Sequence, residues 1–312
     1  MSKKTKKKPE DSDDIEDEEN FVDDPLEDEN GVSNTFDKKY DKENEDFDRR
    51  YRKKYKHKTE DRSTVEGVLD FSTSRELYKL QMNSFLEKIF GVVSTGKESN
   101  VYYATSKDLS FTNNKIGLAL KIFRTRTLDF KKIRFYIDGD IRFTKSGKKS
   151  YQIIQTWALK EYKNLLRAYE NGIAVPQPFH VKRNILIMEF IGEDGIAAKQ
   201  LRTIKDLTND EMQEIYYQVF DQLTLLWTKA NLVHGDLSAY NILYFKDKIY
   251  FIDMGQSVLT NHKFADAFLF RDIETLLYFF SEYEISLQSA EEIFEKITKR
   301  IPDSEFLKLK LL

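Results

Sequence analysis

The sequence contains no cysteine among its 312 residues. This absence excludes disulfide bonds, thiolate zinc sites and a cysteine nucleophile, and it is typical of a reducing compartment. The four histidines are too scattered to predict a histidine-built metal site. No apolar run approaches the roughly 20 residues needed to cross a bilayer, and no apolar h-region follows the lysine-rich start. We therefore expect a soluble intracellular protein that does not enter a membrane.

Charge is segregated along the chain, although the net charge is only −3. Residues 1–8 are mostly lysine, residues 10–29 are mostly acidic with no Lys or Arg, and residues 49–58 are strongly basic. Such blocks bury too little apolar surface to offset chain entropy, so we expect residues 1–62 to be a disordered tail. The tail either solubilises the protein, or its basic block contacts RNA or serves as a nuclear signal.

The stretch from Leu232 to Gly255 carries the clearest chemical signal. Asp236 is followed five residues later by Asn241, and Asp253 comes after a short apolar run. Lys246 to Lys248 reads as a hairpin turn, which returns the chain and places Asp253 near Asn241. Phosphoryl transfer from Mg-ATP needs one carboxylate facing the nucleophile, and a carboxamide and a second carboxylate on Mg²⁺. The stretch therefore predicts this chemistry.

A lysine and a glutamate further upstream are predicted to form a pair. Lys121 lies in an apolar run, residues 118–123, that reads as a strand, and a mid-strand lysine on a buried face needs a carboxylate. The next helix is expected at about residues 151–169. Glu161 lies four residues from both Trp157 and Leu165, so it shares their apolar face and needs a cation. The two side chains satisfy each other's requirement.

A glycine-containing turn resembles a phosphate-binding loop only in part. Residues 91–97 match the start of a G-x-x-x-x-G-K loop, but Glu98 follows where Ser or Thr is needed, and a strand follows rather than a helix. We therefore expect a hairpin loop over ATP phosphates, with backbone N–H groups near Gly96 as donors. Judged alone, this signal is weak.

The remaining segments are interpreted from periodicity and composition. A helix is expected from about Thr73 to its stop at Gly91, and residues 124–150 read as a long basic loop with little core. The loop either contacts RNA or a substrate, or is a solvated flap. A buried strand is expected at residues 185–188. Helices are expected at residues 209–229 and 264–283. Asp272 lies among apolar neighbours in the second helix and could brace the turn before Asp236.

Together, these motifs resemble the RIO family of atypical protein kinases, and specifically its type-1 subgroup. The resemblance implies an α+β, bilobal, protein-kinase-like fold. The N-terminal helix and N-lobe, with an antiparallel sheet and helix C, would occupy residues 63–190, and a short helical C-lobe residues 191–312. No Ala-Pro-Glu segment follows Asp253. The motifs carrying the resemblance are residues 94–102, 160–165, 232–241, 252–258 and 268–272.

The resemblance also implies roles for individual residues, with ATP and Mg²⁺ as cofactors. Asp236 would accept the proton, and Asn241 with Asp253 would hold Mg²⁺. Asp253 would also become an aspartyl phosphate, which makes the protein an ATPase as well as a serine/threonine kinase. The ATP-binding groups would be Lys121, Glu161, the backbones of Glu189 and Ile191, and the loop residues Gly96, Lys97, Glu98 and Ser99.

Members of this family act in late maturation of the small ribosomal subunit. The resemblance implies binding to the pre-40S particle and its rRNA, protein substrates, autophosphorylation, and a cytoplasmic location with nuclear passage left open. Ala239, Lys263 and Ala267 depart from the family pattern of Glu, Pro and Glu, but none removes a catalytic group. Two alternatives stay open: a small-molecule phosphotransferase of the aminoglycoside or choline kinase type, and an RNA-bound scaffold with structural ATP.

Overall fold

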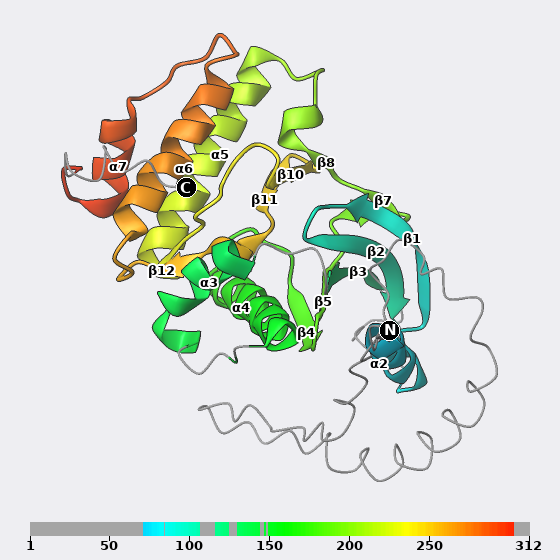
Figure 1. Ribbon diagram of the computed structural model, residues 1–312. Helices are drawn as coiled ribbons and strands as arrows, with labels where there is room; N and C mark the ends of the chain where they lie inside the picture. Colours follow the sequence, from blue (N-terminus) through cyan, green and yellow to red (C-terminus); the bar gives the residue numbers. More distant parts are fainter. Residues whose placement is uncertain are drawn as a thin grey trace, which may run out of the picture. The chain divides into compact units, whose positions relative to one another are not determined.

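The computed structural model describes residues 71–302, except residues 84, 107–115, 125–129, 144–146 and 148. The expected charged tail, residues 1–62, lies outside the described residues. In Figure 1 a strand-rich N-terminal lobe precedes a C-terminal lobe that consists mostly of helices. Within the described residues, no helix has the length and apolar character that a membrane span requires.

The N-terminal lobe is built on a five-stranded antiparallel sheet in the order β1-β2-β3-β5-β4. Alternate side chains of a strand point to opposite faces, so β3 contributes to two cores. Leu118 and Leu120 pack in a small core with helix α2, and Ala119 and Phe123 join the main core. Lys121 therefore faces the main core. The strands are β1 (Lys88–Thr95), β2 (Ser99–Ser106), β3 (Ile116–Phe123), β4 (Pro178–Lys182) and β5 (Ile185–Glu189).

Helix α2 spans Phe71–Met82, so the expected helix that continues to Gly91 is too long. Leu86 contributes to the same small core as α2, but it lies beyond the helix end. Ile89 belongs to β1, and Gly91 is an interior residue of that strand rather than a helix stop. β-branched side chains favour an extended backbone, and the pairing of β1 with β2 satisfies the hydrogen bonds of that backbone.

Residues 124–150 were expected to form a loop, but the central part of this segment is a packed helix. The interpretation as a loop is wrong there. Ile133 and Ile137 are buried, at a spacing of one helical turn. The ring of Phe135 stacks on Phe264 of the C-terminal lobe with 5.6 Å between centroids. The apolar pattern covers little more than two turns among basic residues, which hides it in the sequence. The elements are α3 (Phe130–Asp138) and a 3₁₀ helix (Ile141–Phe143).

Helix α4 spans Ser150–Glu170 and confirms the helix expected at about residues 151–169. It packs between the sheet and the C-terminal lobe, and its apolar side chains belong to the main core. The same helix also buries three polar side chains, those of Lys160, Glu161 and Asn164. Buried polar groups need hydrogen-bond partners, so these three residues mark a face of α4 with specific contacts.

In the part of the chain that the structure describes, the C-terminal lobe contains three α-helices, two short 3₁₀ helices and several short strands (Figure 1). The helices are α5 (Asn209–Thr228), α6 (Ala265–Phe280) and α7 (Ala290–Thr298), and the first two confirm the helices expected there. The short strands are β6 (Gly192–Glu193), β7 (Ile196–Ala197), β8 (Lys199–Gln200), β9 (Leu232–Val233), β10 (Ile242–Phe245), β11 (Lys248–Phe251) and β12 (Val258–Leu259).

The β10–β11 hairpin confirms the turn that was expected before Asp253. Its two loop residues, Lys246 and Asp247, have φ angles of 50° and 61°, which is the backbone of a type I′ turn. At the open end of the hairpin, one residue outside each strand, the Ile252 N–H donates to the Asn241 carbonyl at 3.0 Å. The hairpin thereby brings Asp253 next to Asn241.

Replacing Ile133 with alanine tests whether α3 is part of the core. Ile133 is 2% exposed, so we expect Ile133→Ala to lower the free energy of unfolding by about 2–4 kcal/mol through lost burial and a cavity. Ile141 is 69% exposed in the adjacent 3₁₀ helix, and Ile141→Ala serves as the matched control with a change below about 0.5 kcal/mol. Urea unfolding measures the change in the free energy of unfolding for both variants. Equal effects would mean that α3 does not pack.

Candidate active site

The amino group of Lys121 joins three parts of the structure. Its Nζ atom lies 2.7 Å and 2.8 Å from the two carboxylate oxygens of Glu161 on α4. It also lies 2.9 Å from Oδ1 of Asp253, which follows β11. The predicted pairing of Lys121 with Glu161 is confirmed, and Asp253 is a further partner. A single cation therefore links β3, α4 and the segment after β11.

The charges of this cluster leave an excess of negative charge. Burial opposes the charge of Lys121, but Asp253 and Glu161 raise its pKa above the ordinary value. Burial raises the pKa of Glu161, and the Lys121 ammonium opposes that effect. Burial also acts to raise the pKa of Asp253, yet the same ammonium brings it below the ordinary value. One cation with two carboxylates carries a net charge of −1, which suits binding of a second cation.

Asp253 has a backbone conformation that is uncommon among residues other than glycine. Its φ and ψ angles are 63° and 57°, in the left-handed region, and a 3₁₀ helix at Met254–Gln256 follows directly. Its side chain is 52% exposed, although Lys121 is nearly buried beside it. Asp253 therefore presents a carboxylate to solvent from a backbone position that the surrounding contacts must hold.

The loop that carries Asp236 depends on a glycine. Gly235 has a φ angle of 79°, and a Cβ atom placed there would lie 3.0 Å from the carbonyl oxygen of Gln256. This geometry explains why glycine occupies the position before Asp236. The Asn241 side-chain Nδ2 donates to the Asp236 carbonyl at 2.8 Å. The amide oxygen of Asn241 is therefore the atom left to accept a metal ion.

Asp272 on α6 braces this loop, as predicted from its place among apolar neighbours. Its carboxylate oxygens accept the Gly235 N–H at 2.8 Å and the Leu237 N–H at 3.0 Å. The neighbouring Arg271 guanidinium donates to the Gly235 carbonyl. Both backbone groups of Gly235 are therefore held by α6, which fixes the direction in which Asp236 leaves the turn.

Gln256 contacts the carboxylate of Asp236, a role that the sequence did not reveal. Its Nε2 donates to Oδ2 of Asp236 at 2.7 Å. Burial raises the pKa of Asp236, while the Gln256 hydrogen bond and the charges of Lys132 and Arg271 lower it. The segment after Asp253 therefore tunes the second carboxylate of the site. The only signal was the position of Gln256 within a motif already noted.

The loop between β1 and β2 approaches the same carboxylates. The Gly96 N–H donates to the Ser99 carbonyl at 2.9 Å and so closes the turn. Lys97 is exposed and Ser99 is buried. The pKa of Glu98 is raised by burial and by the charge of Asp253, so Glu98 lies within electrostatic range of that residue. Because the Gly96 N–H is engaged, phosphate donors in this loop must come from the residues after it.

The segment after β5 has the backbone pattern of a hinge between two lobes. The Phe190 N–H donates to the Gly117 carbonyl at 3.1 Å, and the Ile191 carbonyl accepts from Ala198 at 2.9 Å. Neither bond uses the Ile191 N–H or the Glu189 carbonyl, which are the two groups predicted to pair with adenine. Their role in binding adenine stays a prediction.

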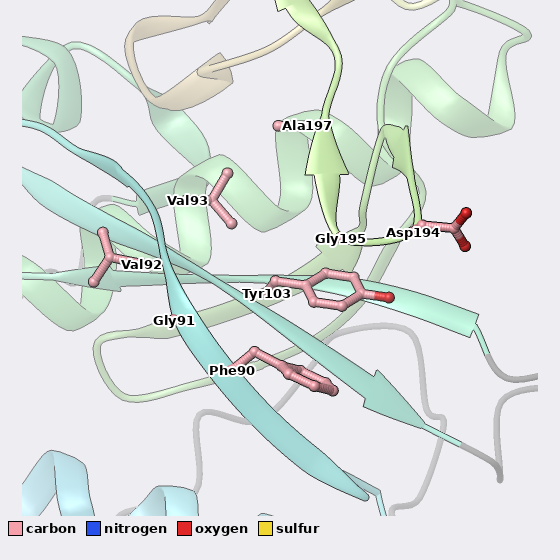
Figure 2. Close-up of a pocket in the computed structure, with 8 residues that line it drawn as sticks. All are labelled: Phe90, Gly91, Val92, Val93, Tyr103, Asp194, Gly195 and Ala197. Atoms are coloured by element: carbon pink, nitrogen blue, oxygen red, sulfur yellow. The ribbon is translucent and has the colours of Figure 1, made fainter.

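A pocket opens beside this hinge, and Figure 2 shows the side chains that line it. Val93 of β1 and Ala197 of β7 lie at one end, and the ring of Tyr103 lies near Phe90 and the turn at Gly195. The Tyr103 ring centroid is 5.1 Å from that of Phe90 and 4.7 Å from that of Phe190. The pocket therefore lies beside Phe190, but none of its lining residues belongs to the segment 189–191.

The metal ligands must be few if a metal binds here. Among the described residues, no group of three or more His, Asp or Glu side chains is arranged to hold a metal ion. The predicted ligands are one carboxylate, from Asp253, and one amide oxygen, from Asn241. Two hard oxygen ligands fit Mg²⁺, which keeps several waters and takes its remaining ligands from substrate phosphates. The donor set therefore suits Mg²⁺ bound together with a nucleotide.

His234 is buried and neutral behind the loop. Its Nε2 lies 3.1 Å from the Ile252 carbonyl and donates to it, and within the described part of the chain Nδ1 has no hydrogen-bond partner. Protonation would bury an unpaired N–H group. Burial accordingly lowers the pKa of His234 from 6.5 to about 4.

A family model and two curated proteins match most of this chain, and all three belong to the RIO family. A model of the RIO domain matches residues 100–293. The chain is 38% identical over 241 residues to serine/threonine-protein kinase rio1 of Dictyostelium discoideum, covering 77% of this chain and 41% of that protein. It is 36% identical over 240 residues to human serine/threonine-protein kinase RIO1, covering 76% and 41%. The chain thus spans less than half the length of these curated relatives.

The arrangement of elements is also similar to a solved structure. The Rio2 kinase–ADP/Mg²⁺–phosphoaspartate complex from Chaetomium thermophilum matches with a TM-score of 0.53 at 18% identity, covering 72% of this chain and 66% of that chain. At this identity the similarity concerns the fold alone. It confirms the predicted fold class, a kinase-like fold with an antiparallel N-lobe sheet and a short helical C-lobe.

The buried neutral His234 predicts a specific pH dependence of stability. Below pH 6.5 the unfolded chain gains a proton at this residue, while the folded chain does not until about pH 4, so acid favours unfolding. The contribution is complete above about pH 6.5 and is lost as the pH falls towards about 4. Between about pH 7.5 and about pH 5, wild type should lose about 2 kcal/mol more than His234→Asn in urea unfolding. Equal losses would contradict this assignment.

Proposed function

Because this chain belongs to the RIO family, we propose that it transfers the γ-phosphoryl group of Mg-ATP, as a serine/threonine kinase with ATPase activity of the type-1 kind. The observation that carries this proposal is the Lys121 amine, bound at once to Glu161 and Asp253. In a kinase fold that arrangement directs the lysine to the nucleotide phosphates. The matched kinases named RIO1 support the same activity.

The binding steps follow from the positions of the residues. Lys121 would contact the phosphates, and the β1–β2 loop with Glu98 and Ser99 would cover them. The Glu189 carbonyl and Ile191 N–H would pair with adenine beside the hinge pocket. Asn241 and Asp253 would hold Mg²⁺, which when bound neutralises charge on the phosphate oxygens. Each of these assignments is part of the proposal.

The chemical step uses the two aspartates in different ways. With a serine or threonine substrate, Asp236 accepts the hydroxyl proton as the oxygen attacks phosphorus and ADP leaves. Burial raises the pKa of Asp236, which brings it closer to neutral pH and makes it a better proton acceptor. For ATP hydrolysis, an oxygen of Asp253 attacks the γ-phosphorus and ADP leaves, and water then hydrolyses the aspartyl phosphate. The phosphoaspartate named for the Rio2 complex supports this second route.

The cellular role rests on the type-1 resemblance. We place the protein in late maturation of the small ribosomal subunit, with the pre-40S particle and its rRNA as partners and the cytoplasm as its site. Protein substrates and autophosphorylation belong to the same proposal. The basic residues of α3 and its neighbouring segments supply positive charge that suits RNA phosphates.

Labelling with γ-³²P-ATP under single-turnover conditions tests the proposal. Wild type should acquire a label that hydroxylamine removes, because an acyl phosphate is cleaved whereas phosphoserine survives. Asp253→Asn should lose this label and at least about 100-fold in turnover, while retaining ATP binding. Addition of pre-40S particles should change turnover. A wholly stable label passed to an added protein would instead indicate a kinase without the aspartyl phosphate.

Asp247→Asn is the matched control for this experiment. Asp247 lies on the same hairpin, is exposed, and also has a positive φ angle, which asparagine tolerates. It should label and turn over like wild type. A similar loss in both variants would place the effect on the hairpin rather than on the carboxylate of Asp253.

Gln256→Leu should change the pH dependence of the reaction. Burial raises the pKa of Asp236 and the Gln256 hydrogen bond lowers it, so loss of the bond raises the pKa further. Asp236 accepts a proton only when ionised, so the acid limb of the pH–rate profile should move to higher pH. The plateau rate should stay within about tenfold of wild type. Gln218→Leu on α5 is the control, and an unmoved acid limb in Gln256→Leu would contradict the role of Asp236.

A further inference from the structure

The buried polar face of α4 contacts the segment that follows Asp253. Lys160 Nζ donates to the Gly255 carbonyl at 3.1 Å and also to the Ser257 carbonyl. Asn164 Nδ2 donates to the Met254 carbonyl at 2.8 Å and to the Ser257 carbonyl at 3.0 Å. Two side chains, one helical turn apart, thus bind three carbonyls within residues 254–257.

We propose that Lys160 and Asn164 are positioning residues that hold residues 253–257 in the conformation required to bind Mg²⁺. This inference rests on the proposed function, because Asp253 is taken as a metal ligand. The left-handed backbone of Asp253 needs support from its surroundings, and the carbonyls bound by α4 begin at the next residue. We call Lys160, Asn164 and these carbonyls the carbonyl clamp.

The clamp reaches both carboxylates of the active site. Asp253 lies directly before residues 254–257, and within them Gln256 donates to Asp236. The same helix supplies Glu161, which binds Lys121. A displacement of α4 would therefore move three groups together. These are Glu161, which binds Lys121, the proposed metal ligand Asp253, and Gln256, which contacts Asp236.

The two side chains of the clamp are costly to bury, which argues that their contacts with residues 254–257 matter. Lys160 is fully buried, with its nearest carboxylate oxygen, from Asp140, 3.8 Å away and itself bonded to Arg142. Burial lowers the pKa of Lys160 to about 7. Within the described residues, the buried Oδ1 of Asn164 has no hydrogen-bond partner. An apolar pair at these positions would avoid both penalties, but it would remove the donors from three carbonyls of residues 254–257.

Close packing around the clamp leaves little freedom for residues 254–257. A Cβ atom on Gly255 would lie 3.0 Å from the Trp157 ring and 3.4 Å from a carboxylate oxygen of Glu161. The segment therefore sits directly against α4. Loss of the clamp donors is expected to loosen the segment without opening the apolar core around it.

Lys160→Met tests the clamp, because methionine keeps the apolar part of the side chain and removes the donors. Isothermal titration with ADP at increasing Mg²⁺ measures the Mg²⁺ concentration for half-maximal binding. We expect this concentration to rise about 10- to 100-fold, with ADP affinity in the absence of Mg²⁺ unchanged. Hydrogen exchange of residues 253–258 should become faster. Lys163→Met, at a half-buried position of the same helix outside the clamp, should match wild type in both measurements.

The outcomes separate this inference from the proposed function. Unchanged Mg²⁺ dependence and unchanged exchange in Lys160→Met would overturn the clamp. A uniform loss of binding at every Mg²⁺ concentration would also overturn it, since that indicates a merely structural role. If Lys160→Met does not fold, Asn164→Leu, which removes the other two contacts, replaces it. If wild type binds no Mg-ADP, the proposed function fails, while the exchange comparison still decides on the clamp.

Discussion

Lys121 places a positive charge where little water reaches, and the carboxylates of Glu161 and Asp253 offset the cost of burying it. These two partners come from different lobes, so the charge is satisfied only when the lobes are correctly arranged. The electrostatic requirement of one side chain thus fixes the relation between β3, α4 and the end of the β10–β11 hairpin. The remaining active-site contacts, including those of Asp236, are built around this arrangement.

Part of the active site was predictable because some residues have few possible partners. Lys121 and Glu161 each lie within an apolar pattern, and a charged group there needs an opposite charge. Asp272 was predictable because a carboxylate among apolar neighbours needs hydrogen-bond donors. Gln256 and Lys160 were not, because Gln256 lies on an irregular segment and Lys160 binds backbone carbonyls. Every residue has a carbonyl, so the sequence contains no sign of which ones a side chain will bind.

The fold was predictable where periodicity was long and unbroken. The strand at residues 118–123 and the helix of about twenty residues after it followed from their patterns. The short helix α3 did not, since little more than two turns of pattern among basic residues give a weak signal. The end of α2 was missed because Leu86 continues the apolar pattern after the helix has stopped. Tertiary packing decided both cases.

The glycine before Asp236 has a consequence for the evolution of this loop. A residue with a side chain at Gly235 would meet both a strained φ angle and the Gln256 carbonyl at 3.0 Å. An arginine at this position, as in conventional kinases, would therefore meet a strained backbone, and the segment at Gln256 would have to shift to admit it. The turn before Asp236 and the segment after Asp253 are therefore expected to change together rather than independently.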